Sequence, residues 1–541
     1  MTSTPDLAPQ ADATIFRGDW PDLDVPRIDL PAFVLARAAE RPDHPALVDG
    51  SSGQMWSYGE LASQVRGVAA GLSARGLRTG EVFAILAPNL PQWLIGAYGA
   101  MTAGAAVTGI NPLYTLDEVA DQLRDAKARY LLTVPPFLDM ARAAVERAGL
   151  ATEIVLHGPP TPGTVAFAEL AEHPDHGFTE PTDGPIDPDR DVALLPYSSG
   201  TSGLPKGVRL THRALVANVL QQAPAIPYAA DDRCLAVAPL FHAVGFSVVA
   251  NSALQAGATV VTMPRFDVET FLATIQEHAI TTMVVVPPIV LALARHPAVE
   301  RYDLSSLRWI GCGAAPLGAE LQQACSRRLD RPVLQGYGMT ELTATAVLWP
   351  LGTPVVPGAA GKLLPGVQAR IVDLETGADR SAGETGELWL RSAAVMAGYL
   401  GNAAATAATL DADGWLHTGD VARIDPDGAV FIVDRVKELI KVKGFQVAPA
   451  ELEAVLRTHP AITDAAVVPV PDERTGERPK AFVVPAGAAV PSAAEVIAFV
   501  AERVAPHKQV RAVEFVTSIP TSPAGKTLRR LLATRPTSSA P

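Results

Sequence analysis

Cysteine is scarce in this chain. Only Cys234, Cys312 and Cys325 occur among 541 residues, and no two of them have the Cys-x-x-Cys spacing. This scarcity argues against a disulfide framework and against a structural zinc site, and it fits a reducing compartment. We therefore expect a cytoplasmic protein.

Long apolar runs and a surplus of basic residues are also lacking. No stretch reaches the roughly 20 uninterrupted apolar residues of a membrane span. The first residues, MTSTPDLAPQADATIF, lack the charged start and apolar core of a signal peptide, and the final PTSSAP is not a peroxisomal address. The net charge of −13 at pH 7 argues against a broad nucleic-acid-binding surface. We expect neither a transmembrane segment nor a nucleic-acid partner.

Apolar residues are abundant, at 48% of the chain, and 541 residues are too many for one core. Short apolar strands alternate with helices as far as about residue 340, which predicts two α/β subdomains with parallel sheets covered on both faces. Short β segments after about residue 360 predict a small β subdomain, and the last hundred or so residues predict a compact α+β domain. The predicted boundaries are a large N-terminal domain over 1–434, a hinge over 435–437 and a small C-terminal domain over 438–541.

Several polar or glycine-rich segments follow predicted strands. Strands over 233–237, 307–310 and 333–334 each run directly into such a segment. Ligands bind beyond the carboxyl ends of strands in open α/β sheets, so these segments are candidates for one site. Residues 159–190 are expected to form a polar, proline-rich surface connection, and a later strand is expected to begin at Val421.

The stretch 194–212, LLPYSSGTSGLPKGVRLTH, has the composition of a phosphate-binding loop. An apolar run over 192–196 predicts a buried strand. The glycines that follow allow close approach of an anion, hydroxyl groups add donors, and Lys206 adds a positive charge at the rim. The order fits neither the Walker A pattern nor the dinucleotide fingerprint. On composition alone, a flexible Ser/Gly linker is an equal alternative.

The order of residues in this loop, SSGTSGLPKGV followed by Thr211-His212, resembles the signature loop of the acyl-adenylate-forming (AMP-binding) superfamily. That superfamily includes acyl-CoA synthetases, 4-coumarate:CoA ligases, luciferases and adenylation domains. Further matching segments follow in the family's order over nearly the whole chain. They are PLFH at 239–242, GAAP at 313–316, QGYG at 335–338, MTE at 339–341, WLHTGD at 415–420, DRVKELIKVKGFQV at 434–447 and PAGK at 523–526. The segment FQVAPAELE at 445–453 is most similar to the 4-coumarate:CoA ligase and luciferase branch.

The resemblance implies an ATP- and Mg²⁺-dependent ligase that joins a carboxylic acid to coenzyme A through an acyl-AMP intermediate. A carboxylate must attack the α-phosphate, anion on anion, so charge has to be neutralised. Mg²⁺ keeps most of its water, and one carboxylate can hold it. Glu341, assisted by Thr340, matches that position. Without the family match, Glu341 would be interpreted as a solvated carboxylate at a helix start. Lys526 matches the lysine that bridges the attacking carboxylate and the phosphate; alone it reads as an exposed tail lysine.

The same match assigns the remaining roles. Asp420 and Arg435 would hold the ribose, with a surface ion pair as the alternative. Tyr337 would stack on adenine, with core packing as the alternative. His242 would line the acyl pocket, with a core histidine as the alternative, and His212 is assigned to structure.

A mobile C-terminal domain is implied because attack by a thiol needs a geometry different from that of adenylation. Lys437 matches the hinge. Lys441 and Gln446 match residues of the adenylation step, and Lys443 with Gly444 matches the face that meets coenzyme A. Taken singly, each of the three lysines would be interpreted as part of a solvated basic strip. The resemblance as a whole implies catalytic roles for Lys526, Lys441, Gln446 and His242, binding roles for Ser198, Ser199, Gly200, Thr201, Ser202, Gly203, Lys206, Gly313, Ala314, Ala315, Gln335, Gly336, Tyr337, Gly338, Thr340, Asp420, Arg435, Lys437, Lys443 and Gly444, and metal binding by Glu341 and Thr340.

The chain departs from plant 4-coumarate ligases in two places. LTATA follows Glu341 where those ligases generally have AGPV, and AVGF after His242 lacks an aromatic hydroxyl that could hold a phenol. An aryl acid of the cinnamate or coumarate kind and a medium- or long-chain fatty acid both remain open as substrates. Alternatives to the ligase are an acyl-AMP ligase that loads a carrier protein, a luciferase-like oxygenase and a non-catalytic nucleotide-binding module. A homodimer is left open, and no nucleophile elbow or His-Glu-x-x-His motif supports a hydrolase.

Overall fold

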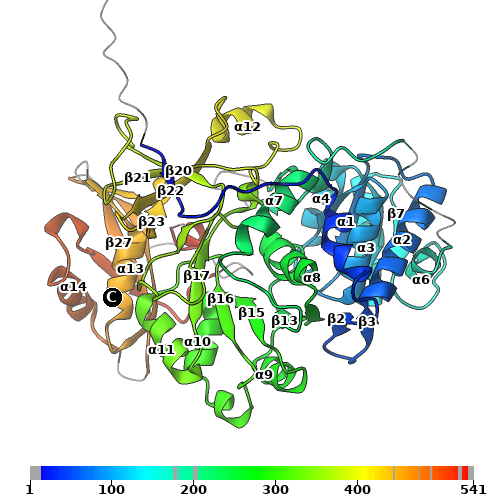
Figure 1. The fold of residues 1–541 in the computed structure, drawn as a ribbon. Helices are drawn as coiled ribbons and strands as arrows, with labels where there is room; N and C mark the ends of the chain where they lie inside the picture. The colour runs from blue at the N-terminus through cyan, green and yellow to red at the C-terminus, as the bar shows by residue number, and fades with distance from the viewer. Residues whose placement is uncertain are drawn as a thin grey trace, which may run out of the picture. The chain divides into compact units, whose positions relative to one another are not determined.

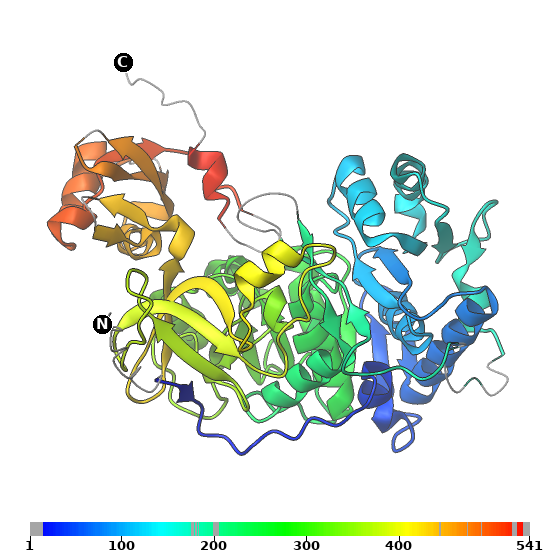
Figure 2. The same ribbon diagram turned by 90° about the horizontal axis from the view of Figure 1, so that it is seen from above.

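The computed structural model describes residues 14–174, 178, 181, 183–198, 205–442, 445–472, 474–487, 490–521 and 527–533. The chain divides into two compact units (Figures 1 and 2). The larger unit comprises Asp19–Val367 and Ser392–Ala412, and the smaller unit comprises Met1–Gly18, Gln368–Arg391 and Asp413–Pro541. In the described part of the chain, every helix is too short or too polar to cross a lipid bilayer.

The first sheet of the larger unit has seven strands within the described residues, all parallel apart from one antiparallel pair at its edge. Val82, Ala84 and Leu86 pack with the helices on one face, whereas the intervening Phe83 lies on the other face, close to Gly96. In sheet order the strands are β12 (Leu210–Thr211), β9 (Val192–Leu194), β5 (Ala106–Gly109), β4 (Val82–Leu86), β6 (Ala128–Thr133), β7 (Glu153–Leu156) and β8 (Val165–Ala166). The helices are α2 (Tyr58–Ala74), α3 (Pro91–Thr102), α4 (Leu116–Ala126), α5 (Leu138–Ala148) and α6 (Phe167–Ala171).

The second sheet of the larger unit has nine strands in the described part of the chain and is parallel from β17 to β2 (Figure 1). Its apolar core joins the strands to three helices, α9 (Val268–Glu277), α10 (Pro287–Arg295) and α11 (Ala319–Leu329). In sheet order the strands are β19 (Lys362–Leu363), β18 (Val347–Leu348), β17 (Val333–Tyr337), β16 (Trp309–Cys312), β15 (Thr282–Val285), β13 (Arg233–Ala236), β14 (Thr259–Thr262), β2 (Pro45–Asp49) and β3 (Met55–Ser57).

Helix starts are encoded locally. Ser57 and Glu60 form a reciprocal capping box at the start of α2, and Thr115 with Glu118 does the same for α4. Proline occupies the first turn of α3 and α10, where its missing N–H costs no hydrogen bond. These residues explain why the helices begin where they do.

The two sheets of the larger unit meet at loops beyond the carboxyl ends of their parallel strands. Asn89, which follows β4, donates to the carbonyl oxygens of Ala236 and Ala238, at 2.8 and 2.9 Å, and accepts from the amide of Leu240 at 2.8 Å. A Cβ on Gly109, at the end of β5, would lie 2.7 Å from the Cα of Phe241. Asn89 and Gly109 therefore fix the 236–241 loop at the edge where α/β sheets hold their ligands.

The smaller unit contains two sheets. One is antiparallel, in the order β1 (Phe16–Arg17), β20 (Gln368–Val372), β21 (Thr385–Arg391), β22 (Leu416–Ile424) and β23 (Val430–Arg435). The other contains β25 (Phe445–Val447), β24 (Ile440–Val442), β27 (Gly476–Pro485) and β26 (Ile462–Asp472), with β28 (Ala512–Phe515) parallel to β27. Helices α13 (Pro449–Arg457) and α14 (Ala493–Ala501) contribute side chains to the core of this second sheet.

The predicted fold class is confirmed: parallel-sheet α/β subdomains, a small β sheet and a C-terminal α+β part are all present. Two local expectations are wrong. All of the WLHTGD segment except Trp415 lies within β22, instead of preceding a strand that begins at Val421. Residues 159–190 contain β8 and α6, instead of connection alone. The boundaries 1–434, 435–437 and 438–541 stay a prediction.

Candidate functional site

The predicted phosphate loop begins and ends in a short β-hairpin. β10 (Tyr197–Ser198) pairs with β11 (Lys206–Gly207), and Ser198 lies opposite Lys206. The loop residues Ser199, Gly200, Thr201, Ser202 and Gly203 lie outside the described residues. The hairpin therefore brings the two ends of the loop together, with a hydroxyl on one strand and an ammonium on the other.

Glu341 is buried beside this hairpin. It lies in a short 3₁₀ turn, η5 (Thr340–Leu342), and is 5% exposed, so a solvated carboxylate does not describe it. Its Oε1 accepts a hydrogen bond from Ser198 Oγ at 2.9 Å and another from the hydroxyl of Tyr399 at 2.9 Å. Ser198, which precedes the loop, and Glu341, 143 residues further along the chain, therefore lie in contact.

Sequence reasoning missed Tyr399. Its hydroxyl donates to Glu341, and its ring lies under the ammonium of Lys206, with Nζ 4.8 Å from the ring centroid. Burial, followed by the charge of Glu341 and the hydrogen bond to it, raises the pKa of Tyr399, so the phenol stays a proton donor. The available signal was a tyrosine in an otherwise alanine-rich stretch, directly after Gly398, whose φ of 122° favours glycine.

The turn that carries Glu341 is strained and tied down. Thr343 has φ 67° and ψ −39°, a conformation that a β-branched residue rarely adopts and that costs of order 1–3 kcal/mol. Its Oγ1 donates to the carbonyl of Ala394 at 2.6 Å, and the amide of Met396 donates to the carbonyl of Glu341 at 2.9 Å. The 394–399 segment therefore fixes this turn. The metal role of Glu341 and Thr340 stays a prediction.

The predicted adenine walls lie at the ends of neighbouring parallel strands. Gly313, Ala314 and Ala315 follow β16, and Ala314 has a φ of 68°. A Cβ on Gly313 would meet only the carbonyl oxygen of Gly336, 3.9 Å away, so the space beside Gly313 is open in this chain. Such a gap beside a backbone turn can accept a planar base.

The companion segment Gln335–Gly338 begins inside β17. Gln335 donates to Gln322 Oε1 at 2.9 Å within the core, and Tyr337 is partly buried. A Cβ on Gly336 would lie 2.5 Å from Leu348 Cδ2, and one on Gly338 would lie 1.8 Å from the carbonyl oxygen of Ala344. The contact at Gly338 is with the backbone, so the packing of the chain itself requires Gly338, whereas at Gly336 the end of the Leu348 side chain would have to move.

The two histidines take different places. His242, partly buried, follows β13 and precedes the π-helix η3 (Val244–Asn251), and its ring lies beside that of Phe241, with centroids 4.3 Å apart. Its role at an acyl pocket stays a prediction. His212 Nδ1 accepts from the amide of Leu30 at 3.0 Å, and burial lowers the pKa of His212 to about 4. The structural assignment of His212 is confirmed.

The remaining predicted residues lie in the smaller unit. Asp420 and Arg435 face one another across β22 and β23, with Arg435 Nε 3.0 Å from Asp420 Oδ1. The ion pair is therefore present, with Asp420 only 3% exposed and Arg435 partly exposed, and the ribose role of both residues stays a prediction. Lys437, in η6 (Val436–Glu438), is exposed, as is Lys441, whose backbone pairs with Gln446 across β24 and β25. Lys443, Gly444 and Lys526 lie outside the described residues.

A cluster of charged side chains surrounds the predicted hinge. Asp434 accepts from the amides of Arg435 and Ala450, at 2.7 and 2.8 Å, and burial raises the pKa of Asp434 to about 6. Arg529 forms ion pairs with Glu438 and Glu453. None of these groups except Arg435 was singled out from the sequence, because no local spacing brings them together.

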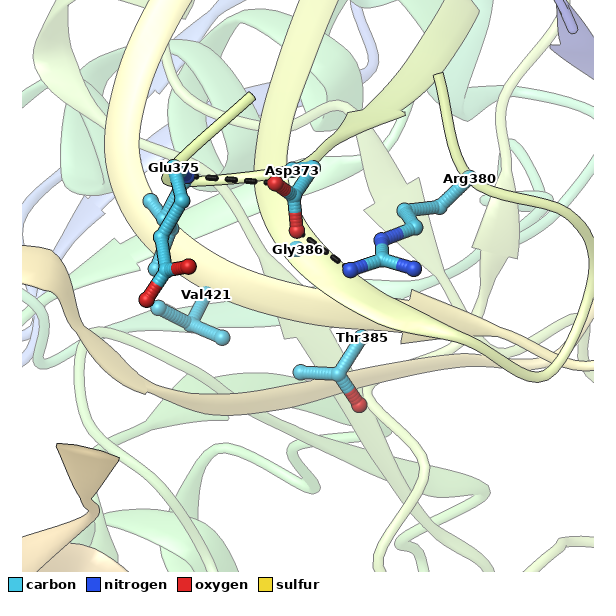
Figure 3. Close-up of a pocket in the computed structure, with 7 residues that line it drawn as sticks. Asp373, Glu375, Arg380, Thr385, Gly386 and Val421 are labelled. Atoms are coloured by element: carbon cyan, nitrogen blue, oxygen red, sulfur yellow. Dashed lines mark hydrogen bonds and ion pairs between the residues drawn. The ribbon is translucent and has the colours of Figure 1, made fainter. Parts of the chain in front are cut away.

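A pocket of about 350 Å³ lies in the smaller unit (Figure 3), and it is lined by Val421, the residue after Asp420, but by none of the predicted site residues. Asp373 at its wall accepts from the amides of Glu375 and Thr376, at 3.2 and 2.7 Å, and from the guanidinium of Arg380. The Thr376 hydroxyl also donates to Asp373, at 2.7 Å, and this hydrogen bond, followed by those from the amides and from Arg380, lowers the pKa of Asp373. Its polar groups are engaged in a turn, so the pocket gives no reason to infer a ligand there. Among the described residues, no group of three or more His, Cys, Asp or Glu could hold a metal ion.

Comparison with known proteins identifies the family of this chain. Residues 34–400 match the AMP-binding enzyme family, and residues 451–526 match the AMP-binding enzyme C-terminal domain. A 4-coumarate–CoA ligase of Pinus taeda is 42% identical over 531 residues, which cover 96% of this chain and 97% of that protein. ATP-bound MatB from Rhodopseudomonas palustris has a TM-score of 0.85 at 29% identity, over 94% of this chain and 98% of that one. The anthranilate CoA ligase AuaEII in complex with anthranoyl-AMP has a TM-score of 0.85 at 28% identity, over 94% of this chain and 97% of that one. The chain therefore belongs to the AMP-binding enzyme family and, within it, to the adenylate-forming acid–CoA ligases that are similar to 4-coumarate–CoA ligase.

Proposed function

We propose that this chain joins an aryl carboxylic acid to coenzyme A in two steps. In the first step, a carboxylate oxygen attacks the α-phosphorus of ATP, the bond to the β-phosphate oxygen breaks, and pyrophosphate leaves. In the second step, the thiol of coenzyme A loses its proton and attacks the acyl carbon. The acyl–phosphate bond breaks, and AMP leaves with the thioester as product. The observation that carries the proposal is the buried Glu341, held by Ser198 at the base of the phosphate loop.

Binding of ATP by the larger unit is supported by the ends of the loop and by the open space beside Gly313. Lys206 and the hydroxyl of Ser198 would hold phosphate oxygens, because they lie on facing positions of the hairpin. Glu341 and Thr340 fit a Mg²⁺ ion, because one buried carboxylate and a hydroxyl can hold an ion that keeps most of its water. When bound, Mg²⁺ neutralises charge on the phosphates.

The two steps call for different groups of the chain. Lys526 would neutralise charge between the attacking carboxylate and the phosphate. Lys441 and Gln446 would act in the first step, and Lys443 and Gly444 would face coenzyme A in the second. We expect the C-terminal part to turn about Lys437 between the steps, because one arrangement cannot present both sets.

An aryl acid is favoured over a fatty acid by the relatives. Several that match over nearly their whole length are named 4-coumarate–CoA ligases, at about 40% identity, and AuaEII is named an anthranilate CoA ligase. The chain itself does not favour a hydroxylated ring. Phe246, in the AVGF segment, is fully buried against Trp93 and Tyr98, with ring centroids 5.6 and 5.7 Å apart, so it is core and not a ring-binding wall.

The test is a panel of 4-coumarate, cinnamate, benzoate and octanoate, assayed for AMP release with and without coenzyme A. We expect acid-dependent exchange of pyrophosphate into ATP, and a thioester, seen by mass spectrometry, only when coenzyme A is present. Exchange without a thioester would favour transfer to a carrier protein, and light emission or oxygen uptake would favour the luciferase-like alternative. No exchange with any acid would overturn the proposal in favour of a nucleotide-binding module.

A further inference from the structure

Tyr399 contacts both charged groups that the proposed function places around the phosphates. Its hydroxyl donates to Glu341 at 2.9 Å, and its ring lies 4.8 Å from the ammonium of Lys206. It is 8% exposed, so both contacts lie in a desolvated setting where they are stronger than in water. One side chain therefore links the phosphate loop to the candidate metal carboxylate.

The two carboxylate oxygens of Glu341 differ in their hydrogen bonds. Oε1 takes both hydrogen bonds, from Ser198 and from Tyr399, and among the described residues none donates to Oε2. Two donors on one oxygen fix the plane of the carboxylate, and leave the other oxygen to a cation.

Two opposite charges, those of Lys206 and Glu341, both lie against Tyr399. In the described part of the chain no ion pair joins Lys206 to Glu341, although both contact this one side chain. If the two paired directly, each would neutralise the other and neither would be available for phosphate or metal. A neutral ring holds a cation without cancelling its charge.

Tyr399 is itself held by backbone contacts. Its amide donates to Oγ1 of Thr406, in α12 (Ala403–Thr409), at 2.9 Å. Five residues before it, Ala394 accepts from the strained Thr343, in the turn that carries Glu341. The 394–399 segment is therefore joined to that turn by hydrogen bonds.

We propose that Tyr399 is a positioning residue for adenylation: its hydroxyl aims Glu341 at a divalent cation, and its ring holds Lys206 ready for phosphate. The inference rests on the proposed function, because it assigns a supporting residue to that same site. Nothing in it requires Tyr399 to touch the substrate.

The first test uses Tyr399→Phe, which removes the hydroxyl and keeps the ring. We expect the Mg²⁺ concentration for half-maximal pyrophosphate exchange to rise about tenfold, in line with loss of a hydrogen bond to a charged group. The maximal rate at saturating Mg²⁺ should fall by no more than about threefold. Binding of Mn²⁺ in the presence of α,β-methylene-ATP, followed by electron paramagnetic resonance of free Mn²⁺, should weaken by a similar factor.

The matched control is Tyr302→Phe. It removes a hydrogen bond of the same kind, from Tyr302 to Glu269 at 2.8 Å, on the surface and outside the candidate site. Its Mg²⁺ titration and Mn²⁺ binding should equal those of the parent protein.

A second variant, Tyr399→Leu, removes the ring as well. It should raise the KM for ATP beyond that of Tyr399→Phe, because Lys206 loses its support. The inference is overturned if Tyr399→Phe leaves both the Mg²⁺ titration and Mn²⁺ binding unchanged. It is also overturned if the variant slows exchange and thioester formation from synthetic acyl-AMP equally, since that marks a general folding role. If the parent protein showed no pyrophosphate exchange with any acid, the proposed function would be overturned instead. Mn²⁺ binding would then still test the positioning role of Tyr399.

Discussion

Arg529 donates hydrogen bonds to Glu453 from two nitrogens: Nη2 lies 2.9 Å from each carboxylate oxygen, and Nε lies 3.1 Å from Oε1. The Glu453 side chain is only 4% exposed, so this guanidinium compensates a buried charge. Arg529 opens α15 (Arg529–Ala533), three residues after Lys526. The described residues on either side of Lys526 are joined by a bridge between Thr521 and Thr527 and by the amide of Leu528, which donates to the Pro520 carbonyl at 2.8 Å.

We expect Arg529→Leu to destabilise the smaller unit by about 3–5 kcal/mol, because it leaves Glu453 charged, buried and without its partner. Adenylation should fall more than thioester formation from synthetic acyl-AMP, because the anchor next to Lys526 is lost. Urea unfolding and the two separate half-reactions measure these effects. In the control Arg503→Leu, an exposed pair with Glu502 is removed, and stability should change by less than about 1 kcal/mol. If Arg503→Leu lowered the free energy of unfolding as much as Arg529→Leu, the buried pair of Arg529 would contribute no more stability than an exposed pair.

Lys526→Ala should slow adenylation by roughly 10²–10³-fold, on the scale of removing one oxyanion-stabilising donor. Thioester formation from synthetic acyl-AMP should keep nearly its full rate, because that step no longer has to join two anions. Pyrophosphate exchange and single-turnover thioester formation report the two steps separately. Lys508→Ala, which removes an ammonium paired with Glu451 in the same unit, should leave both rates unchanged. Equal loss in both half-reactions would contradict the assigned role of Lys526.

Much of this molecule could be predicted from sequence because its signals are local. The apolar strands, the capping boxes at Ser57 and Thr115, and the motif segments follow from spacing within a few residues. The meeting of Ser198 with Glu341 could be expected only through the family resemblance. The contacts of Tyr399 and of Arg529 could not be predicted, because each joins residues far apart in the chain. Tyr399 reaches back 58 residues to Glu341, and Arg529 reaches back 76 residues to Glu453, with no periodicity that marks either pair.

Gly313→Ala and Gly338→Ala test whether a glycine serves the nucleotide or the fold. An added Cβ at Gly313 meets nothing closer than 3.9 Å, so Gly313→Ala should unfold at the same temperature as the parent protein. It should nevertheless raise the KM for ATP at least several-fold, because the methyl group occupies the space proposed for the base. An added Cβ at Gly338 would lie 1.8 Å from the Ala344 carbonyl oxygen, so Gly338→Ala should lower the yield of folded protein. Thermal unfolding and ATP titration separate the two outcomes, and an unchanged KM in Gly313→Ala would remove the adenine site from that position.

Asp434 should make the stability of the smaller unit depend on pH. Burial raises its pKa from 3.8 to about 6 in the folded state. Between these values the folded protein binds a proton that the unfolded chain releases. The stabilising contribution is therefore complete below about pH 4 and is lost as the pH rises through 6. The loss amounts to about 3 kcal/mol by pH 7.5, at 1.36 kcal/mol for each pKa unit.

Asp434→Asn cannot titrate, so it should lack this contribution. We expect the free energy of unfolding of the parent protein to fall more steeply from pH 4.5 to 7.5 than that of Asp434→Asn, when urea unfolding is followed at fixed ionic strength. The exposed Asp427→Asn, in the turn before β23, should keep the pH dependence of the parent protein. Parallel curves for the parent protein and Asp434→Asn would mean that the amides of Arg435 and Ala450 offset the cost of burying the charge. The carboxylate would then remain ionised beside the hinge throughout this range.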